Sequence, residues 1–208
     1  MTIATGRSRG DNPRVVRHRR KNRLPQEDSC QALSIPPAFK YESEGGPGIE
    51  AILRLLRDSD TPAEDQRAFL KTIVVFWLMG ATDGHAKNFS VFLYPGGRYR
   101  MTPLYDVISA QPSVDEGQIR QNSFRLAMAV GDNRHYRTNS ITPRHFLQSA
   151  EHAGVGEEIV HSIFGELRET GQEAIARTLD RLPARFPKQV SASIRDGFLR
   201  RLKLIQRT

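Results

Sequence analysis

The sequence predicts a mainly α-helical fold with one small β-hairpin. Apolar residues recur at helical spacing from residue 49 onward, and the chain after Ser140 keeps a helical pattern to its end. Between Phe89 and Thr102, two strand-like runs flank the turn Pro95-Gly96-Gly97, which predicts a hairpin. With 208 residues, 38% of them hydrophobic, the chain is long enough to bury one core.

The first predicted helix follows an irregular stretch. Residues 24–48 carry prolines at 36, 37 and 47 and the turn cluster Gly45-Gly46-Pro47-Gly48, so we expect mostly irregular structure, with a short helix between Leu24 and Leu33. From Ile49, apolar residues follow the i, i+3, i+4, i+7 pattern of an amphipathic helix.

The second predicted helix has clear ends. Thr61 is a capping residue, Pro62 suits the first helical position, and Glu64 completes a capping box. The segment 73–79 is apolar on every side, so we expect this helix to be the central buried one, with Gly80 ending it.

The remaining helices follow Ser140. Thr142-Pro143 begins one that Gly154 ends, and further helices are expected near 157–168, 171–182 and 188–206. The expected breaks between them lie at Gly171, Pro183 and Pro187.

Charge is concentrated at the N-terminus. Residues 1–23 hold eight basic residues against one acidic residue, whereas residues 24–208 hold 23 basic and 22 acidic residues. We therefore interpret residues 1–22 as a basic, disordered, solvated tail and residues 23–208 as the folded domain. Such a tail can also bind nucleic-acid phosphates without sequence preference.

Three classes of protein are disfavoured by the composition. No apolar run is long enough to span a membrane, and the first residues show no signal-peptide pattern, so a cytoplasmic protein is expected. The single cysteine, Cys30, excludes an internal disulfide and a cysteine-rich metal site.

Polar residues gather in one segment between the central helix and the hairpin, GATDGHAKNFSVFL at 80–93. Asp83 and Asn88 match D-x-x-x-x-N, and Asp106 lies beyond the second strand. Phosphoryl transfer uses such a set: one carboxylate orients or deprotonates the attacking hydroxyl, while an amide oxygen and a second carboxylate hold Mg²⁺. Lys87 would direct a positive charge toward the transferred phosphate, and His85 would tie the segment together.

The spacing alone leaves a structural alternative open. Asp83 and Asn88 could satisfy backbone donors around the turns at Gly80 and Gly84, and His85 could be a hydrogen-bonded structural residue.

A family resemblance adds to this pattern. GATDGHAKNFSVFL followed by RYRMTPLYDVISA resembles the catalytic segment of the HipA family of bacterial serine/threonine kinase toxins. Residues 23–49, FRLAMAVG at 124–131 and ITPRHFL at 141–147 resemble further segments of that family, so the likeness covers roughly residues 23–206.

The resemblance implies a fold, a reaction and partners. It implies a protein-kinase-like C-terminal lobe, with Asp83 as catalytic base, Asn88 and Asp106 at the metal positions, ATP as co-substrate and Mg²⁺ as cofactor. It also implies an antitoxin-like partner and a protein substrate, with aminoacyl-tRNA synthetases among the family's targets.

One part of the family pattern is missing. HipA-like kinases carry a β-rich N-terminal lobe with the phosphate-binding loop, but the residues before Arg23 show no glycine-rich strand pattern. We therefore expect this chain by itself to be weakly active or inactive. Either a chain that carries the N-terminal lobe completes it as an enzyme, or it is a truncated remnant that only binds an antitoxin-like protein.

Overall fold

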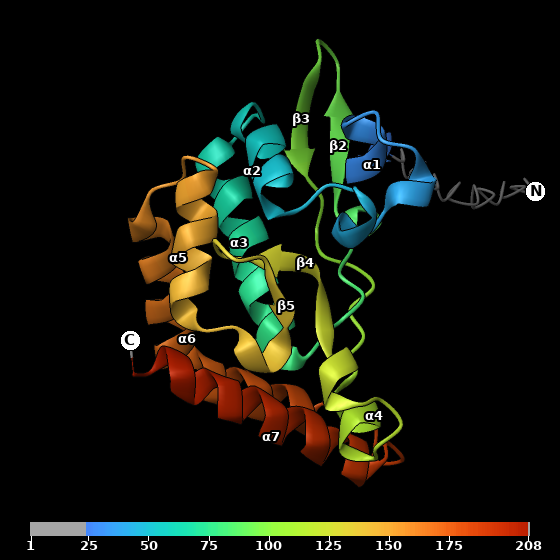
Figure 1. Ribbon diagram of the computed structural model, residues 1–208, viewed down its shortest axis with the longest axis vertical. Helices are drawn as coiled ribbons and strands as arrows, with labels where there is room; N and C mark the ends of the chain where they lie inside the picture. The colour runs from blue at the N-terminus through green and yellow to red at the C-terminus, as the bar shows by residue number, and fades with distance from the viewer. Residues whose placement is uncertain (1–23, 208) are drawn as a thin grey trace, which may run out of the picture.

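The computed structural model describes residues 24–207, so the predicted tail lies outside the described residues. Its α-helices and strands are labelled in Figure 1. The α-helices are α1 (Ser29–Ala32), α2 (Ile49–Arg57), α3 (Pro62–Met79), α4 (Gln111–Asp115), α5 (Pro143–His152), α6 (Glu157–Asp180) and α7 (Lys188–Ile205). The strands are β1 (Gln26–Asp28), β2 (Ser90–Tyr94), β3 (Arg98–Met101), β4 (Arg125–Val130) and β5 (His135–Arg137). Short 3-10 helices are η1 (Pro37–Phe39), η2 (Glu42–Glu44), η3 (Ala86–Asn88), η4 (Gln121–Ser123) and η5 (Thr138–Ser140).

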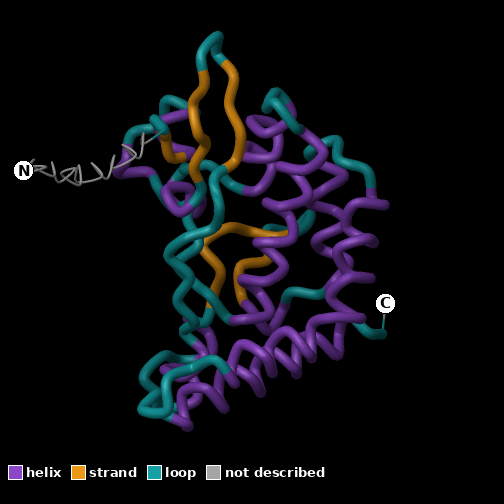
Figure 2. Tube along the Cα trace, turned by 180° about the vertical axis from the view of Figure 1, so that it is seen from behind, coloured by secondary structure: helices purple, strands orange, loops and turns teal. Residues whose placement is uncertain are grey.

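Helix α3 is the central buried helix, as predicted. It contacts α2, α5, α6 and α7, and Figures 1 and 2 show α7 running crosswise at the end of the molecule opposite the hairpin. Trp77 is fully buried, its ring centroid lies 5.5 Å from that of Phe146, and its Nε1 donates a hydrogen bond to the Thr138 carbonyl at 3.0 Å. Gly80 ends the helix in the left-handed conformation (φ 64°), as expected of a C-terminal glycine.

The start of α3 is where the sequence was misread. Thr61 precedes the helix, but its side chain makes no capping hydrogen bond, and Glu64 instead pairs with Arg100 of β3 at 2.8 Å. The predicted capping box is therefore wrong. A partner on a neighbouring strand competes for the carboxylate, and the helix position alone does not reveal it.

Helix α6 also differs from the prediction. It runs through Gly171 without a break, as one helix from Glu157 to Asp180. Gly171 is buried, and a Cβ atom there would lie 3.2 Å from Leu202 Cδ2 of α7. The glycine therefore permits close approach of α7 rather than ending the helix. The expected division before α7 is confirmed, since α7 begins at Lys188, directly after Pro187.

The predicted hairpin is confirmed as β2 and β3, which pair antiparallel with Phe92 opposite Arg100. Strand β1 joins it on the other side, with Glu27 opposite Val91, and forms an antiparallel three-stranded sheet. The sequence did not predict β1, because three residues next to a short helix carry too little pattern to recognise.

A second sheet, β4 paired with β5, was also not predicted as strands. Residues 126–130 of β4 are all buried, so the strand lacks the alternation of apolar and polar residues by which half-buried strands are recognised. No helix of the described residues is long and apolar enough to cross a lipid bilayer.

Candidate active site

Two backbone contacts fix the segment that carries the candidate residues where it leaves the end of α3. The Ala81 N–H donates to the Phe76 carbonyl at 2.8 Å, and Ala81 forms a β-bridge with Ser109. At Gly84, a Cβ atom would lie 2.3 Å from two ring carbons of Phe76, so only glycine fits. The chain therefore passes directly over the core at this point, and Asp83 stands immediately before it.

Asp83 is mostly exposed, with 61% of its side-chain surface accessible. Tyr41, from the loop before α2, donates its hydroxyl to Asp83 Oδ1 at 2.7 Å. This hydrogen bond to the carboxylate is the main reason that the pKa of Tyr41 rises to about 12. Tyr41 thus remains a donor at neutral pH and orients Asp83 without protonating it.

Asn88 and Asp106 are brought together, as the sequence analysis expected. Asn88 is 4% exposed, and its Nδ2 donates to Asp106 Oδ2 at 3.0 Å. The Asn88 side-chain oxygen accepts the His85 backbone N–H at 3.2 Å, which fixes the orientation of the amide. A buried amide therefore holds an exposed carboxylate in place.

The loop that carries Asp106 is fixed at both ends. Tyr105 donates its hydroxyl to the Lys87 carbonyl at 2.9 Å, and the Ser109 hydroxyl donates to the Met79 carbonyl at 2.6 Å. Between these anchors Asp106 has φ 56°, a left-handed conformation that a residue other than glycine seldom adopts. Strain of this kind persists only where surrounding contacts enforce it, and it is frequent at functional sites.

His85 is buried beneath the segment. Its ring packs edge-on against Tyr41 with centroids 5.1 Å apart, and its Nε2 lies 4.0 Å from Asp83 Oδ1. Burial, aided by the positive charge of Lys40, lowers the pKa of His85, so the ring is neutral at pH 7. Its ring contacts Tyr41 and its backbone N–H donates to Asn88, and the tying role expected of it stays a prediction.

Lys87 occupies a different place from the one expected. Its Nζ lies 3.2 Å from Asp28 Oδ2, at the junction of β1 and α1, and its side chain is 38% exposed. In this arrangement its charge is directed toward Asp28 and not toward the approach to Asp83. Because the Asp28 side chain is only 14% exposed, release of Lys87 would leave a largely buried carboxylate without its ion-pair partner.

The two carboxylates border one hollow. Asp83, Gly84, Asp106 and Ile108 line it, together with Phe76 and Ala81. Among the described residues, only Asn88 donates a hydrogen bond to Asp106, on Oδ2, so Oδ1 is available to a ligand. The described residues contain no group of three His, Cys, Asp or Glu side chains that could hold a metal. The oxygen groups that are present, the carboxylates of Asp83 and Asp106 and the amide of Asn88, suit Mg²⁺, because this ion is usually held by one or two carboxylates together with substrate phosphates.

Tyr41, Tyr105 and Asp28 were missed as site residues by sequence reasoning. Tyr41 and Asp28 lie far before the segment in sequence, and Tyr105 lies after the hairpin, yet each contacts the segment in the fold. A tyrosine in an irregular, proline-rich stretch carries no local signal of its partner. Residues 36–48 could have been singled out only through the family likeness of the segment that contains them.

Comparison with protein families gives a match over most of the chain. The model of the HipA-like C-terminal domain matches residues 8–175. Among curated proteins, a putative kinase, Y4mE, from Sinorhizobium fredii is 36% identical over 162 residues, which cover 76% of this chain and 36% of the relative. The serine/threonine-protein kinase toxin HipA of Shewanella oneidensis is 28% identical over 167 residues, 75% of this chain and 36% of the relative.

Solved structures share the fold. The HipA chain in a complex of Shewanella oneidensis HipA, HipB and operator DNA aligns with a TM-score of 0.73 at 24% identity, covering 89% of this chain and 44% of that one. A proinflammatory kinase from Helicobacter pylori, CtkA, aligns with a TM-score of 0.50 at 13% identity, covering 89% of this chain and 70% of that one. The chain thus spans a little over a third of the length of these curated relatives.

Proposed function

The chain belongs to the HipA-like C-terminal domain family, and from that premise we propose that it supplies the catalytic half of a serine/threonine protein kinase. The observation that carries the proposal is the pairing of Asn88 with Asp106 beside the hollow that Asp83 also lines. Two curated relatives are named as a putative kinase and a serine/threonine-protein kinase toxin.

In the proposed reaction Asp83 accepts the proton of the substrate hydroxyl. The hydroxyl oxygen bonds to the γ-phosphorus of ATP while the bond between that phosphorus and the bridging oxygen breaks, and ADP leaves with the electron pair. Tyr41 holds Asp83 Oδ1, which leaves the exposed Oδ2 to receive the proton. Lys87 would have to leave Asp28 before its charge could serve the phosphate.

Asp106 Oδ1 and the Asn88 amide are the groups that would hold Mg²⁺ in this proposal. When bound, the ion neutralises charge on the phosphates. Asn88 presents its Nδ2 to Asp106 and its oxygen to His85. We therefore assign Asp106 as the direct ligand and Asn88 as the residue that orients it; the Asn88 oxygen would have to give up the His85 N–H before it could bind the ion.

The surroundings of Asp106 fit an enzyme that needs a further lobe to close the site. Four apolar or aromatic side chains of its loop are exposed, and Ile108 is the most exposed of them at 70%. They are Leu104, Tyr105, Val107 and Ile108. Because water must be excluded during phosphoryl transfer, we propose that a β-rich lobe covers this surface, in the same polypeptide or in a second chain.

The proposed biological setting follows from the named relatives. HipA of Shewanella oneidensis has been solved with HipB and operator DNA, so we propose an antitoxin-like protein as a partner and a type II toxin–antitoxin system as the context. By family resemblance the substrate is a protein hydroxyl, with aminoacyl-tRNA synthetases as the first class to test.

A second candidate function is an inactive module that only binds an antitoxin-like protein. The position of Lys87, paired with Asp28 away from Asp83, favours this alternative.

Two measurements separate the candidates. Calorimetric titration with Mg²⁺–ATP should give binding that Asp106→Ala abolishes. Phosphate transfer, measured with the complementing lobe present, should be lost in Asp83→Asn while the free energy of unfolding stays nearly unchanged. Wild-type transfer rates in Asp83→Asn would refute the assignment of the base. Absence of nucleotide binding and of transfer in the complemented form would favour the binding module.

A further inference from the structure

A second cavity lies near the C-terminal end of α3, away from the hairpin. It is bordered by α7, α4 and the two short helices η4 and η5. Its volume is about 530 Å³, within the range of about 300–1,000 Å³ that small-molecule sites occupy. None of the residues that line it belongs to the candidate active site. Its floor is buried, formed by Arg201, Thr138, Gln111 and Phe124, and its rim is exposed.

Arg201 is a buried cation without a carboxylate partner in the part of the chain that the structure describes. Its Nε and Nη2 donate to the Leu78 carbonyl at 3.1 and 2.8 Å, and its Nη1 donates to Gln111 Oε1 at 2.9 Å. Three of its five N–H donors are thereby used, which leaves two for a ligand. Burial, with a smaller effect of neighbouring Arg200, lowers the pKa of Arg201 to about 10, so it stays charged at neutral pH.

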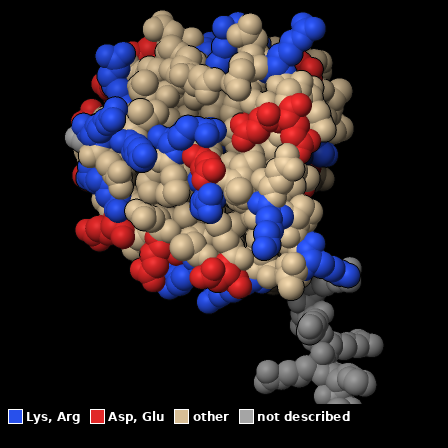
Figure 3. Space-filling view, turned by 90° about the horizontal axis from the view of Figure 1, so that it is seen from below, with Lys and Arg blue, Asp and Glu red and all other residues tan. Residues whose placement is uncertain are grey.

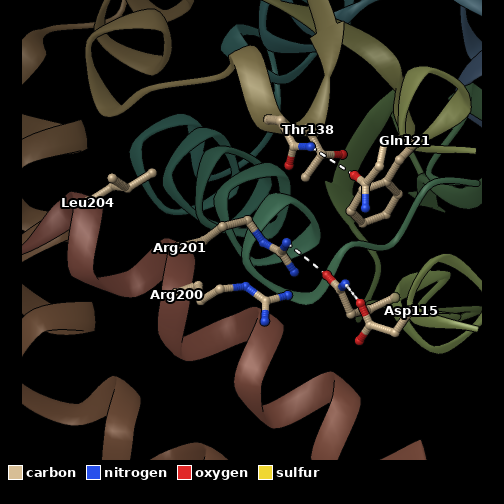
Figure 4. A pocket seen from close by; sticks show the side chains of 9 residues that line it. Asp115, Gln121, Thr138, Arg200, Arg201 and Leu204 are labelled. Atoms are coloured by element: carbon tan, nitrogen blue, oxygen red, sulfur yellow. Dashed lines mark hydrogen bonds between the residues drawn. The ribbon is translucent and has the colours of Figure 1, made fainter.

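Arg200 adds a second positive charge on the exposed rim. Figure 4 shows both arginine side chains extending from α7 in the same direction, toward Asp115. Asp115 does not neutralise them directly, because one of its oxygens accepts from Gln111 and the other from Ser193. The lining therefore carries a net charge of +1, from two arginines and one aspartate.

The wider surface has the same sign. Helix α7 carries five basic residues and a single acidic one, Asp196. Figure 3, which views the molecule from the side of α7, shows Lys and Arg side chains gathered on this face with a few acidic groups among them. Such a field raises the local concentration of anions.

Thr138 is a buried polar residue in the wall of the cavity. It is 1% exposed and lines the cavity, yet its Oγ1 has no hydrogen-bond partner among the described residues. Its backbone is held by Trp77 Nε1 and by the Phe124 carbonyl, so the side chain has little freedom to seek a partner elsewhere. Its Oγ1 is closed off from solvent, so it is an unsatisfied buried hydroxyl that does not reach into the cavity.

We propose that this cavity is a binding site for a small molecule that carries a phosphate or carboxylate group. Arg201 and Arg200 contact the anionic group, and the amides of Gln121 and Asn139 border the opening. Those two amides are already joined, Asn139 Nδ2 to Gln121 Oε1 at 2.9 Å (Figure 4), which leaves Gln121 Nε2 as a further donor.

The test measures the shift in melting temperature of the 208-residue chain with inorganic phosphate, ribose 5-phosphate or citrate, at constant ionic strength and without Mg²⁺. Binding to the folded state alone raises the melting temperature with ligand concentration. We expect Arg200→Gln to weaken the binding about tenfold, because it removes a hydrogen bond to a charged group. A response to the phosphates alone, or to citrate alone, identifies which oxyanion the site takes.

Lys203→Gln is the matched control, since it removes the same charge from an exposed position of α7 outside the cavity. It should leave the ligand shift unchanged. Asp106→Ala should also leave it unchanged, which separates this site from the proposed nucleotide site.

Without ligand, Thr138→Val should unfold at the wild-type temperature or higher, because it removes an unsatisfied hydroxyl. The proposal is overturned if none of the three probes shifts the melting temperature. It is also overturned if Lys203→Gln loses the shift as fully as Arg200→Gln, because the anions would then act on the whole basic helix.

Discussion

Gly84→Ala tests how the candidate active site is positioned by the core. The Cβ of an alanine would lie 2.3 Å from Cδ2 and from Cε2 of Phe76, well inside van der Waals contact. Phe76 cannot withdraw easily, because it is 2% exposed and its ring packs on that of Phe89 with centroids 5.8 Å apart. Either the segment must move by about 1 Å or the ring must leave its rotamer.

Overpacking of this kind costs about 1–3 kcal/mol, and we expect about 2 kcal/mol for Gly84→Ala, measured by urea denaturation. The backbone at Gly84 has no positive φ, so the cost is steric and not conformational. If the segment moves, Asp83 moves with it, and a displacement near 1 Å can lower a transfer rate about 100-fold. The rate should therefore fall further than the loss of stability explains.

A double-mutant cycle identifies the cause. Phe76→Val removes both ring carbons that the new methyl group meets, so Gly84→Ala should cost less than about 0.5 kcal/mol in that background. Gly165→Ala is the control within α6, where a Cβ meets nothing within 4 Å, and it should stabilise the chain by up to about 1 kcal/mol. A Gly84→Ala variant as stable as wild type, or equally destabilised in both backgrounds, would refute this account.

Three further perturbations test single contacts. Tyr41→Phe should lower the free energy of unfolding by about 1 kcal/mol, measured by urea denaturation, because it removes the hydrogen bond to Asp83 Oδ1. In an Asp83→Ala background, where no side-chain oxygen remains to accept the hydroxyl, it should cost almost nothing; equal losses in both backgrounds would show that the hydrogen bond does not form. His145 has a pKa lowered first by burial and then by His135 and Arg144, so the unfolded chain binds a proton before the folded one, and stability should fall as the pH drops below about 6.5. His145→Gln should flatten that part of a melting-temperature profile against pH, and an unchanged slope would contradict the assignment. Glu166 has a pKa lowered by hydrogen bonds from Lys71 and Arg67. Its contribution to the free energy of unfolding is therefore present above about pH 4.5 and is lost as the pH falls further. Glu166→Gln should not show that loss.

Elements with a strong periodic pattern were predictable from the sequence. The amphipathic spacing from Ile49 predicted α2, and the apolar run ending at Gly80 predicted the burial and the end of α3. The hairpin was predictable because a Pro-Gly-Gly turn separates its strands. In each case the signal lies within the element itself.

The parts that failed depend on neighbours that the local sequence does not reveal. Gly171 was expected to break a helix, but Leu202 of α7 occupies the space where its side chain would be. Strand β4 is buried along its length and so shows no alternation, and Glu64 is drawn to a strand instead of the helix end. Each error comes from a tertiary contact that overrides a correct local preference.

The candidate site shows the same division. The spacing of Asp83, Asn88 and Asp106 indicated phosphoryl transfer because the three residues lie on one continuous stretch with the hairpin between them. Tyr41, which holds Asp83, and Asp28, which holds Lys87, come from separate segments and were not found. Spacing therefore indicated the candidate groups for this chemistry, whereas the residues that orient them could be found only from the fold.

Arg201 shows why the orientation of this site depends on a distant helix. Its guanidinium donates hydrogen bonds to the Leu78 carbonyl, five residues before Asp83, and to Gln111 Oε1, five residues after Asp106. One buried guanidinium thus joins the two segments that carry the candidate carboxylates, at the ends opposite the hairpin. A lysine could not do this, because its single ammonium lacks the planar fork that reaches both acceptors. In the sequence, Arg201 is one of several basic residues in an amphipathic C-terminal helix, where a solvated charge is the ordinary expectation. Its burial beneath the start of the candidate active-site segment means that α7, although it contributes no residue to the proposed chemistry, helps to set the geometry in which that chemistry would occur.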